Sequence, residues 1–152
     1  MSDPVTFDVT SPRFGLPLLY AGQSQKEAFV NEAHALTDAL LHCAIEGEAN
    51  APPSAPVDGT SWLVGSSPTG AWAGMAGKLA FRQSGNWLFA PPRDGLRILN
   101  RASGQEIRFL TTWRVPAKPA AAAGGTVIDT QARAAIVNLM ESLELAGIFA
   151  AD

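Results

Sequence analysis

The sequence predicts an α+β protein: an N-terminal extended arm and helix, a small antiparallel β module, and a C-terminal helix. Three observations predict this class. Residues 24–46 and 126–152 carry apolar side chains at steps of three and four, as amphipathic helices do. Residues 60–115 hold short runs rich in aromatic and branched residues, separated by turn-forming residues. Connectors at 48–59, rich in proline, and at 116–125, rich in alanine and glycine, separate these parts.

The first part, residues 1–47, is expected to begin as an irregular extended segment, because prolines and glycines punctuate it as far as Gly22. Ser24 and Glu27 have the spacing of a capping box, which predicts a helix start there. Gly47 is the expected end of that helix. The predicted apolar stripe of the helix consists of Phe29, Ala33, Leu36, Leu40 and Cys43.

The β module, residues 60–115, is predicted from six short runs, and it contains every tryptophan of the chain. A module of this size has a small core, which large aromatic side chains fill economically. The predicted strands are SWLVG, KLAFR, NWLFA, GLRIL, EIRFL and TWRV.

The C-terminal segment, residues 126–152, predicts a short extended piece and a helix capped by Asp129 or Thr130. Gly147 is expected to end this helix in the left-handed conformation. An isolated helix of about four turns is marginal in water, so it must pack against something. The first helix, the β module and copies of the same helix all remain open as the partner.

Charge is scarce and unevenly distributed. Only 16% of residues are charged, against about 25% in typical soluble domains, which favours burial of surface in an assembly. The net charge of −3 argues against nucleic acid as a partner. Residues 57–115 nevertheless hold seven Lys or Arg against three acids. This basic middle could attract the acidic flanks of another subunit, or it could be chance surface charge.

Targeting and membrane signals are not expected. The N-terminus lacks a basic start followed by an apolar run, which predicts no signal peptide and synthesis in the bacterial cytoplasm. No stretch approaches the roughly 18 apolar residues of a membrane span, so no membrane partner is expected. Cys43 is the only cysteine, which excludes an intrachain disulfide, and it is expected to be a small core residue.

No motif predicts catalysis, a metal or a cofactor. His34, Asp38 and His42 share a predicted helix face, but that face is simply the polar one. The segment GMAGK lacks the first glycine and the final Ser or Thr of a phosphate-binding loop. The sequence therefore predicts that the protein is not an enzyme.

Tryptophans offer a different possibility, because sugar faces stack on exposed aromatic rings. Trp72, in a glycine-rich loop, and Trp113 are the candidates for glycan contact. Packing in the core is the alternative for both side chains.

Several motifs together resemble a known family. They are the GLPLL lead-in, GQSQKE, NEA followed by LTDAL, DGTSWLVG, PTGAWAG and WLFAPPRDG, and they span about residues 11–115. This pattern resembles a family of uncharacterised structural domains in alphaproteobacterial phages and gene transfer agents. The tail TVIDTQARAAIVNLMESL also looks like a terminal helix that follows this domain in such proteins.

The resemblance implies a structural component of a virion or gene transfer agent particle: a head-spike base or a fibre adapter, without catalytic residues. Its implied partners are copies of itself, as a trimer or pentamer, and particle proteins such as the capsid and spike fibre. The alternative function is a carbohydrate-binding module that contacts polysaccharide on the host surface.

Two apolar groups are the expected interface. The first group lies in the lead-in, from Leu16 to Tyr20, and the second in the C-terminal segment. The lead-in group would lie on a neighbouring subunit or dock on the particle, or it would only cover the chain's own helix. The expected interface residues are Leu16, Leu18, Leu19, Tyr20, Ile136, Leu139, Leu143 and Phe149.

Overall fold

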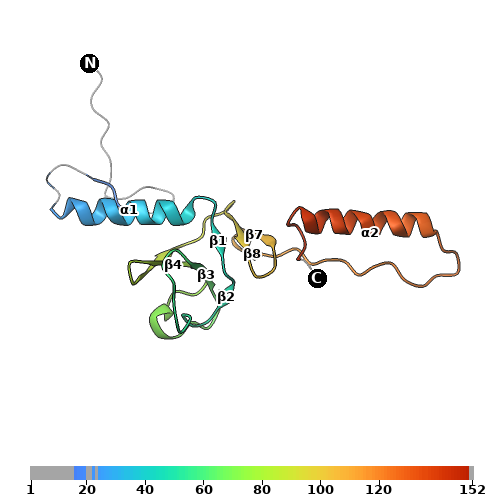
Figure 1. Cartoon of the computed structure of the whole chain (residues 1–152), viewed down its shortest axis with the longest axis horizontal. Coiled ribbons are helices and arrows are strands. Elements are labelled where there is room, and N and C mark those ends of the chain that lie inside the picture. The colour runs from blue at the N-terminus through green and yellow to red at the C-terminus, as the bar shows by residue number, and fades with distance from the viewer. Residues whose placement is uncertain (1–15, 20–21, 23, 151–152) are drawn as a thin grey trace, which may run out of the picture.

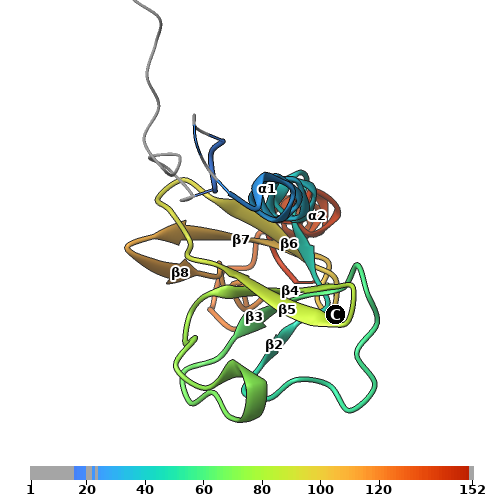
Figure 2. The same cartoon turned by 90° about the vertical axis from the view of Figure 1, so that its left-hand side faces the viewer.

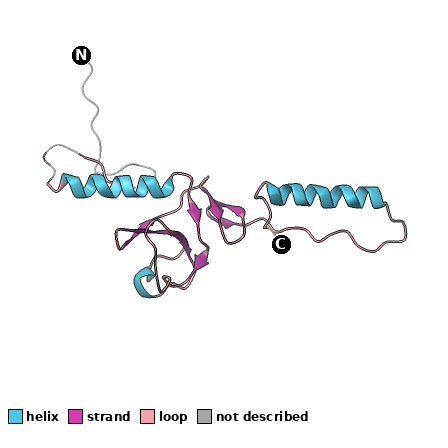
Figure 3. Ribbon diagram, in the orientation of Figure 1, coloured by secondary structure: helices cyan, strands magenta, loops and turns pink. Residues whose placement is uncertain are grey.

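A computed structural model describes residues 16–19, 22 and 24–150 of the 152-residue chain. It confirms the predicted α+β class: two helices flank a β module of two small sheets (Figures 1 and 3). The helices project from opposite sides of the module along the long axis of the molecule (Figure 1). The elements are α1 Lys26–Leu40, β1 Ala44–Ile45, β2 Glu48–Ala49, β3 Ser61–Val64, the short 3-10 helix η1 Gly70–Trp72, β4 Leu79–Gln83, β5 Asn86–Ala90, β6 Arg97–Asn100, β7 Gln105–Leu110, β8 Thr112–Arg114 and α2 Thr130–Leu145.

The six predicted strands are all present, as β3 to β8, and consecutive strands pair antiparallel within each sheet. One sheet has the order β1-β6-β7-β8 and the other β2-β3-β4-β5 (Figure 2). Ser84 and Gly85 form the two-residue turn between β4 and β5, and both have positive φ, as the tight hairpin turn requires. The predicted turn residues therefore set the register of this hairpin.

Two parallel pairings were not predicted, and they correct the first helix. It was expected to run through residue 46, but α1 ends at Leu40, and His42 takes a left-handed conformation with φ 49°. The chain then becomes extended, so that β1 pairs with β6 and β2 with β3. Residues 44–49 thus join the two sheets. Cys43 is buried as predicted, but it lies beyond the helix, and Gly47 does not end it.

The expected capping box at the start of α1 is also wrong. The N-cap is Gln25, in a left-handed conformation with φ 52°, and no side chain caps the helix. Ser24 lies one residue too early to accept from the first turn. At α2 the prediction is confirmed, because the Asp129 carboxylate accepts a hydrogen bond from Ala132 N at 2.8 Å.

The main core lies between the two sheets and is closed at one end by α1. Leu36, on α1, is 7% exposed and belongs to the same buried cluster as side chains of both sheets. A second, smaller cluster lies on the other face of the β3-β4-β5 layer, where Trp72 covers Val64 and Ala80. The buried members of the main core are Leu36, Cys43, Ile45, Leu63, Leu79, Phe81, Ala90, Leu96, Ile98 and Ile107.

Candidate functional site

The C-terminal segment forms an arm that projects from the β module. Residues 116–125 run outward and α2 returns alongside them (Figure 1). Lys118 forms an ion pair with Glu144, and the Arg133 guanidinium donates to the carbonyls of Ala122 and Gly124. The connector therefore packs against one side of α2 and is not a free linker.

The root of this arm is fixed to β7. The buried amide of Gln105 donates from Nε2 to the carbonyl of Pro116 at 2.7 Å and to that of Ile148 at 2.8 Å. Gly147 O accepts a hydrogen bond from Glu106 N at 2.7 Å. One strand thus holds both ends of the arm, because Pro116 begins its outward run and Ile148 follows its helix.

Gly147 ends α2 as predicted. It has φ 71°, its N–H donates to Glu144 O, and the next N–H, of Ile148, donates to Leu143 O. This pair of bonds is the Schellman arrangement, which satisfies the last carbonyls of a helix. The left-handed glycine also turns the chain so that its own carbonyl reaches β7.

Two stripes of apolar side chains run along α2, and the connector borders one of them. The first contains Val137, 38% exposed, and Met140, 8% exposed, which line a depression together with residues 118–121 of the connector. The second contains Ile136, 46% exposed, and Leu139, 59% exposed. The second stripe, here called the uncovered stripe, consists of Ala132, Ile136, Leu139, Leu143 and Ala146, all exposed except Leu143, which is half-buried.

The uncovered stripe carries no charge. The whole helix has three charged residues, Arg133, Glu141 and Glu144, and none belongs to this stripe. Arg133 and Glu144 instead contact the connector. A helix surface exposed to water usually carries charged or polar side chains, so this one has the composition of a contact surface.

The other expected interface residues are distributed differently. Leu16 packs against the main core of its own chain, so it covers that core, as the alternative interpretation allowed. Leu18 is half-buried and Leu19 is 52% exposed, whereas Tyr20 lies outside the described residues. At the other end, Leu143 and Phe149 are half-buried. Among the described residues, the lead-in exposes one large apolar side chain, Leu19, whereas α2 exposes four: Ile136, Val137, Leu139 and Leu145.

Some exposed apolar side chains were missed by sequence reasoning. Leu145, 91% exposed, lies outside the heptad-like spacing that selected its neighbours. Val127 and Ile128, just before the cap of α2, are 89% and 55% exposed at the far end of the arm. The signal that could have identified Val127 and Ile128 is their position as two branched apolar residues directly before the helix N-cap, Asp129.

Of the two alternatives for Trp72, glycan contact and packing in the core, the structure shows packing. Its side chain is fully buried, because η1 folds it over the outer face of the sheet, where its ring meets Trp87 edge-on with centroids 5.1 Å apart. Trp113 is half-buried, packs edge-on against Phe109 and donates from Nε1 to Gly77 O. Trp72 therefore offers no ring face to a sugar.

The histidines and the aspartate considered as metal ligands do not form a site. His34 and Asp38 are exposed on α1, whereas His42 lies beyond its end and does not share the helix face. Within the described residues, no group of three His, Cys, Asp or Glu side chains is arranged to hold a metal ion.

No helix in the described part of the chain is long and apolar enough to cross a membrane.

These features define a small α+β scaffold that carries an anchored helical arm with one apolar face uncovered. Comparison with known families agrees on the extent of the scaffold: the model for a protein of unknown function (DUF2793) matches residues 30–114, from α1 to β8. The chain belongs to this family. No curated protein matches it.

Proposed function

We propose that this chain is a structural component of a phage-like particle, a head-spike base or fibre adapter, that assembles through the α2 arm. The observation that carries the proposal is the uncovered, charge-free apolar stripe on a helix held away from the module. The resemblance of its sequence motifs to domains of phages and gene transfer agents supports the particle assignment.

A copy of the same chain is the partner that fits this stripe best. In a parallel bundle of α2 helices around a symmetry axis, the same residues of every copy face the axis, so any charge there would meet its own copies. The uncovered stripe avoids this repulsion, and its steps of four and three residues suit packing in a helical bundle. Figure 1 shows α2 beyond the β module along the long axis of the molecule, so the module does not flank this helix.

Light scattering with a charge substitution tests this assembly. The wild-type chain at micromolar concentration is expected to have the mass of a trimer or pentamer of the 15.9 kDa protomer. Leu139→Glu should give the protomer mass, because it places a carboxylate at the centre of the bundle. Gln131→Glu adds the same charge outside the stripe and should keep the oligomer.

A wild-type chain that scatters as a 15.9 kDa monomer would overturn the assembly. The particle assignment has a separate test, in which the labelled chain is located on purified particles by electron microscopy. Labelling at a head vertex or at a fibre attachment point is the expected result. Particles without label would contradict it.

The carbohydrate-binding alternative receives no support from Trp72, whose ring is covered by its own module. Only Trp113 remains of the two aromatic candidates, and it is partly engaged with Phe109. We therefore keep assembly as the proposed function.

A further inference from the structure

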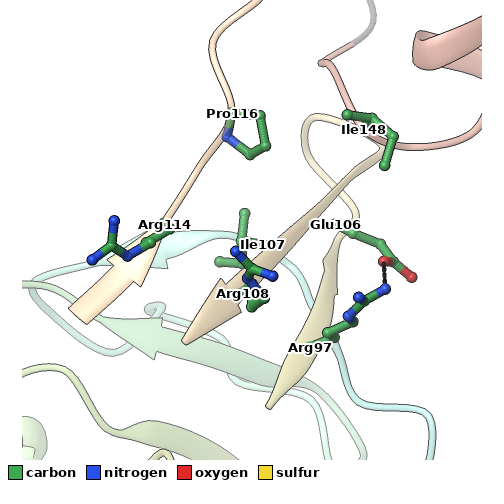
Figure 4. Close-up of a pocket in the computed structure, with 7 residues that line it drawn as sticks. All are labelled: Arg97, Glu106, Ile107, Arg108, Arg114, Pro116 and Ile148. Atoms are coloured by element: carbon green, nitrogen blue, oxygen red, sulfur yellow. Dashed lines mark ion pairs between the residues drawn. The ribbon is translucent and has the colours of Figure 1, made fainter. Parts of the chain in front are cut away.

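Three arginines form a row across the sheet that carries the arm. Arg97 on β6 lies directly opposite Arg108 on β7, and Arg108 lies directly opposite Arg114 on β8 (Figure 4). Directly opposite residues point to the same face of a sheet, and neighbouring strands are about 4.8 Å apart. The row thus places three permanent positive charges side by side on the outer face.

This arrangement is unfavourable without a counter-charge, because like charges directly opposite each other destabilise a sheet. Glu106 compensates in part, with Oε2 3.8 Å from Arg97 Nη1. That pair is exposed, so it contributes little. Among the described residues, neither Arg108 nor Arg114 forms an ion pair with a carboxylate. Two of the three charges are therefore left uncompensated there.

The row lines a depression at the root of the arm. Its volume is about 220 Å³, and Pro116 and Ile148 form an apolar wall beside the arginines (Figure 4). This wall is fixed in place, because Gln105 binds the carbonyls of both residues. The depression therefore combines a rigid apolar side with guanidinium donors.

We infer that the arginine row is a binding site for a multiply charged oxyanion, such as a phosphate or closely spaced carboxylates. The planar guanidinium fork matches both groups and binds them with paired hydrogen bonds. An anion between Arg108 and Arg114 removes their mutual repulsion, and the apolar wall accommodates an uncharged part of the ligand. This inference does not depend on the proposed assembly.

Titration with inorganic phosphate and with citrate, in low-salt buffer, tests the site. Calorimetry should detect saturable binding of at least one of the two anions to the full chain, and that anion should raise the melting temperature. Binding of citrate alone assigns the site to carboxylates, and binding of phosphate alone assigns it to phosphates. Arg108→Gln and Arg114→Gln should each weaken binding about tenfold or more, because each removes charged hydrogen-bond donors.

The same variants should be more stable than wild type in anion-free buffer, by about 1–5 °C in melting temperature, because they relieve the repulsion. Arg93→Gln is the matched control. It removes the same charge, but Arg93 is exposed in the turn between β5 and β6, outside the arginine row. It should bind like wild type. Equal loss of binding in the control, or no binding to wild type, would overturn the inference.

Discussion

At the scale of single residues, Cys43 and Trp72 are both buried, each by side chains of the β module. Cys43 was expected to be buried and is. For Trp72 the sequence left glycan contact and core packing open, and the ring is packed: Gly70 and Gly74, both with positive φ, flank the turn η1 that places it on the sheet. Exposure depends on what covers a side chain, and Trp72 is covered by side chains of the strands before and after its loop, such as Val64 and Ala80.

Cys43 leads to a prediction about pH. Burial raises the pKa of its thiol from 9.0 to about 11, because the thiolate loses its hydration. The folded state therefore keeps a proton that the unfolded chain releases above pH 9. The stability that follows is fully present below pH 9 and is lost as pH rises towards 11, by at most about 1.4 kcal/mol per pH unit.

Urea unfolding at pH 8, 9 and 10 measures this effect against Cys43→Ala. The free energy of unfolding of the wild type should fall more steeply above pH 9 than that of the variant, since other titrating groups are common to both chains. Thiol reagents should label the native protein at pH 8 only slowly. Parallel stability curves together with rapid labelling would show that the thiol is accessible to water.

At the scale of elements, alternation and turn residues located all six strands of the module, but they did not give the end of α1. Residues 43, 45 and 47 are buried in alternation, which is a strand pattern. It was hidden because Cys43 also continues the helical spacing of Leu36 and Leu40. The parallel partners of this segment come from distant strands, so local patterns could not choose between the two periods.

The end of α2 provides a prediction at this scale. Gly147 has φ 71°, and a Cβ there would meet Gly104 O at 3.4 Å. Gly147→Ala should therefore weaken the anchoring of the arm by about 1–2 kcal/mol, the cost of a left-handed non-glycine residue. The amide of Glu106, which donates to Gly147 O, should exchange its hydrogen about 5–30 times faster.

The control for this variant is Gly95→Ala, and hydrogen exchange resolved by residue compares the two. Gly95 also has positive φ, 91°, and no atom lies within 4 Å of a Cβ built there. Gly95→Ala imposes similar backbone strain within the module, so it should leave the Glu106 amide at its wild-type rate. Equal acceleration in both variants would mean that the arm opens with the whole module and not at its root.

At the scale of the whole molecule, the α+β class was predictable from the sequence, but the division of the chain into a module and an anchored arm was not. The sequence suggested a flexible link between the module and a helix of unknown partner. The structure makes this link part of the arm, because Lys118 and Arg133 join it to α2. Hydrogen bonds from the Gln105 side chain and from the Glu106 backbone amide then orient the arm. Such long-range polar contacts leave no periodic trace in a sequence.

This division predicts that the module folds without its arm. Among the described residues, both core clusters draw only on positions 16–113, and the family match covers nearly the same span. A chain that ends at Val115 should therefore unfold cooperatively, with a melting temperature within a few degrees of that of full-length Leu139→Glu. Removal of the arm leaves Gln105 without its two carbonyl acceptors, but water can replace them once the site is open.

Near-UV circular dichroism and light scattering measure the outcome. All four tryptophans lie in the module, so the truncated chain should keep the aromatic signal of the full-length variant. It should also be monomeric, because the uncovered stripe has been removed. A truncated chain without aromatic signal would mean that the arm completes the core, whereas a folded oligomer would place the interface on the module. Comparison with Leu139→Glu separates these results, because that variant keeps the whole arm and only places a charge in the uncovered stripe.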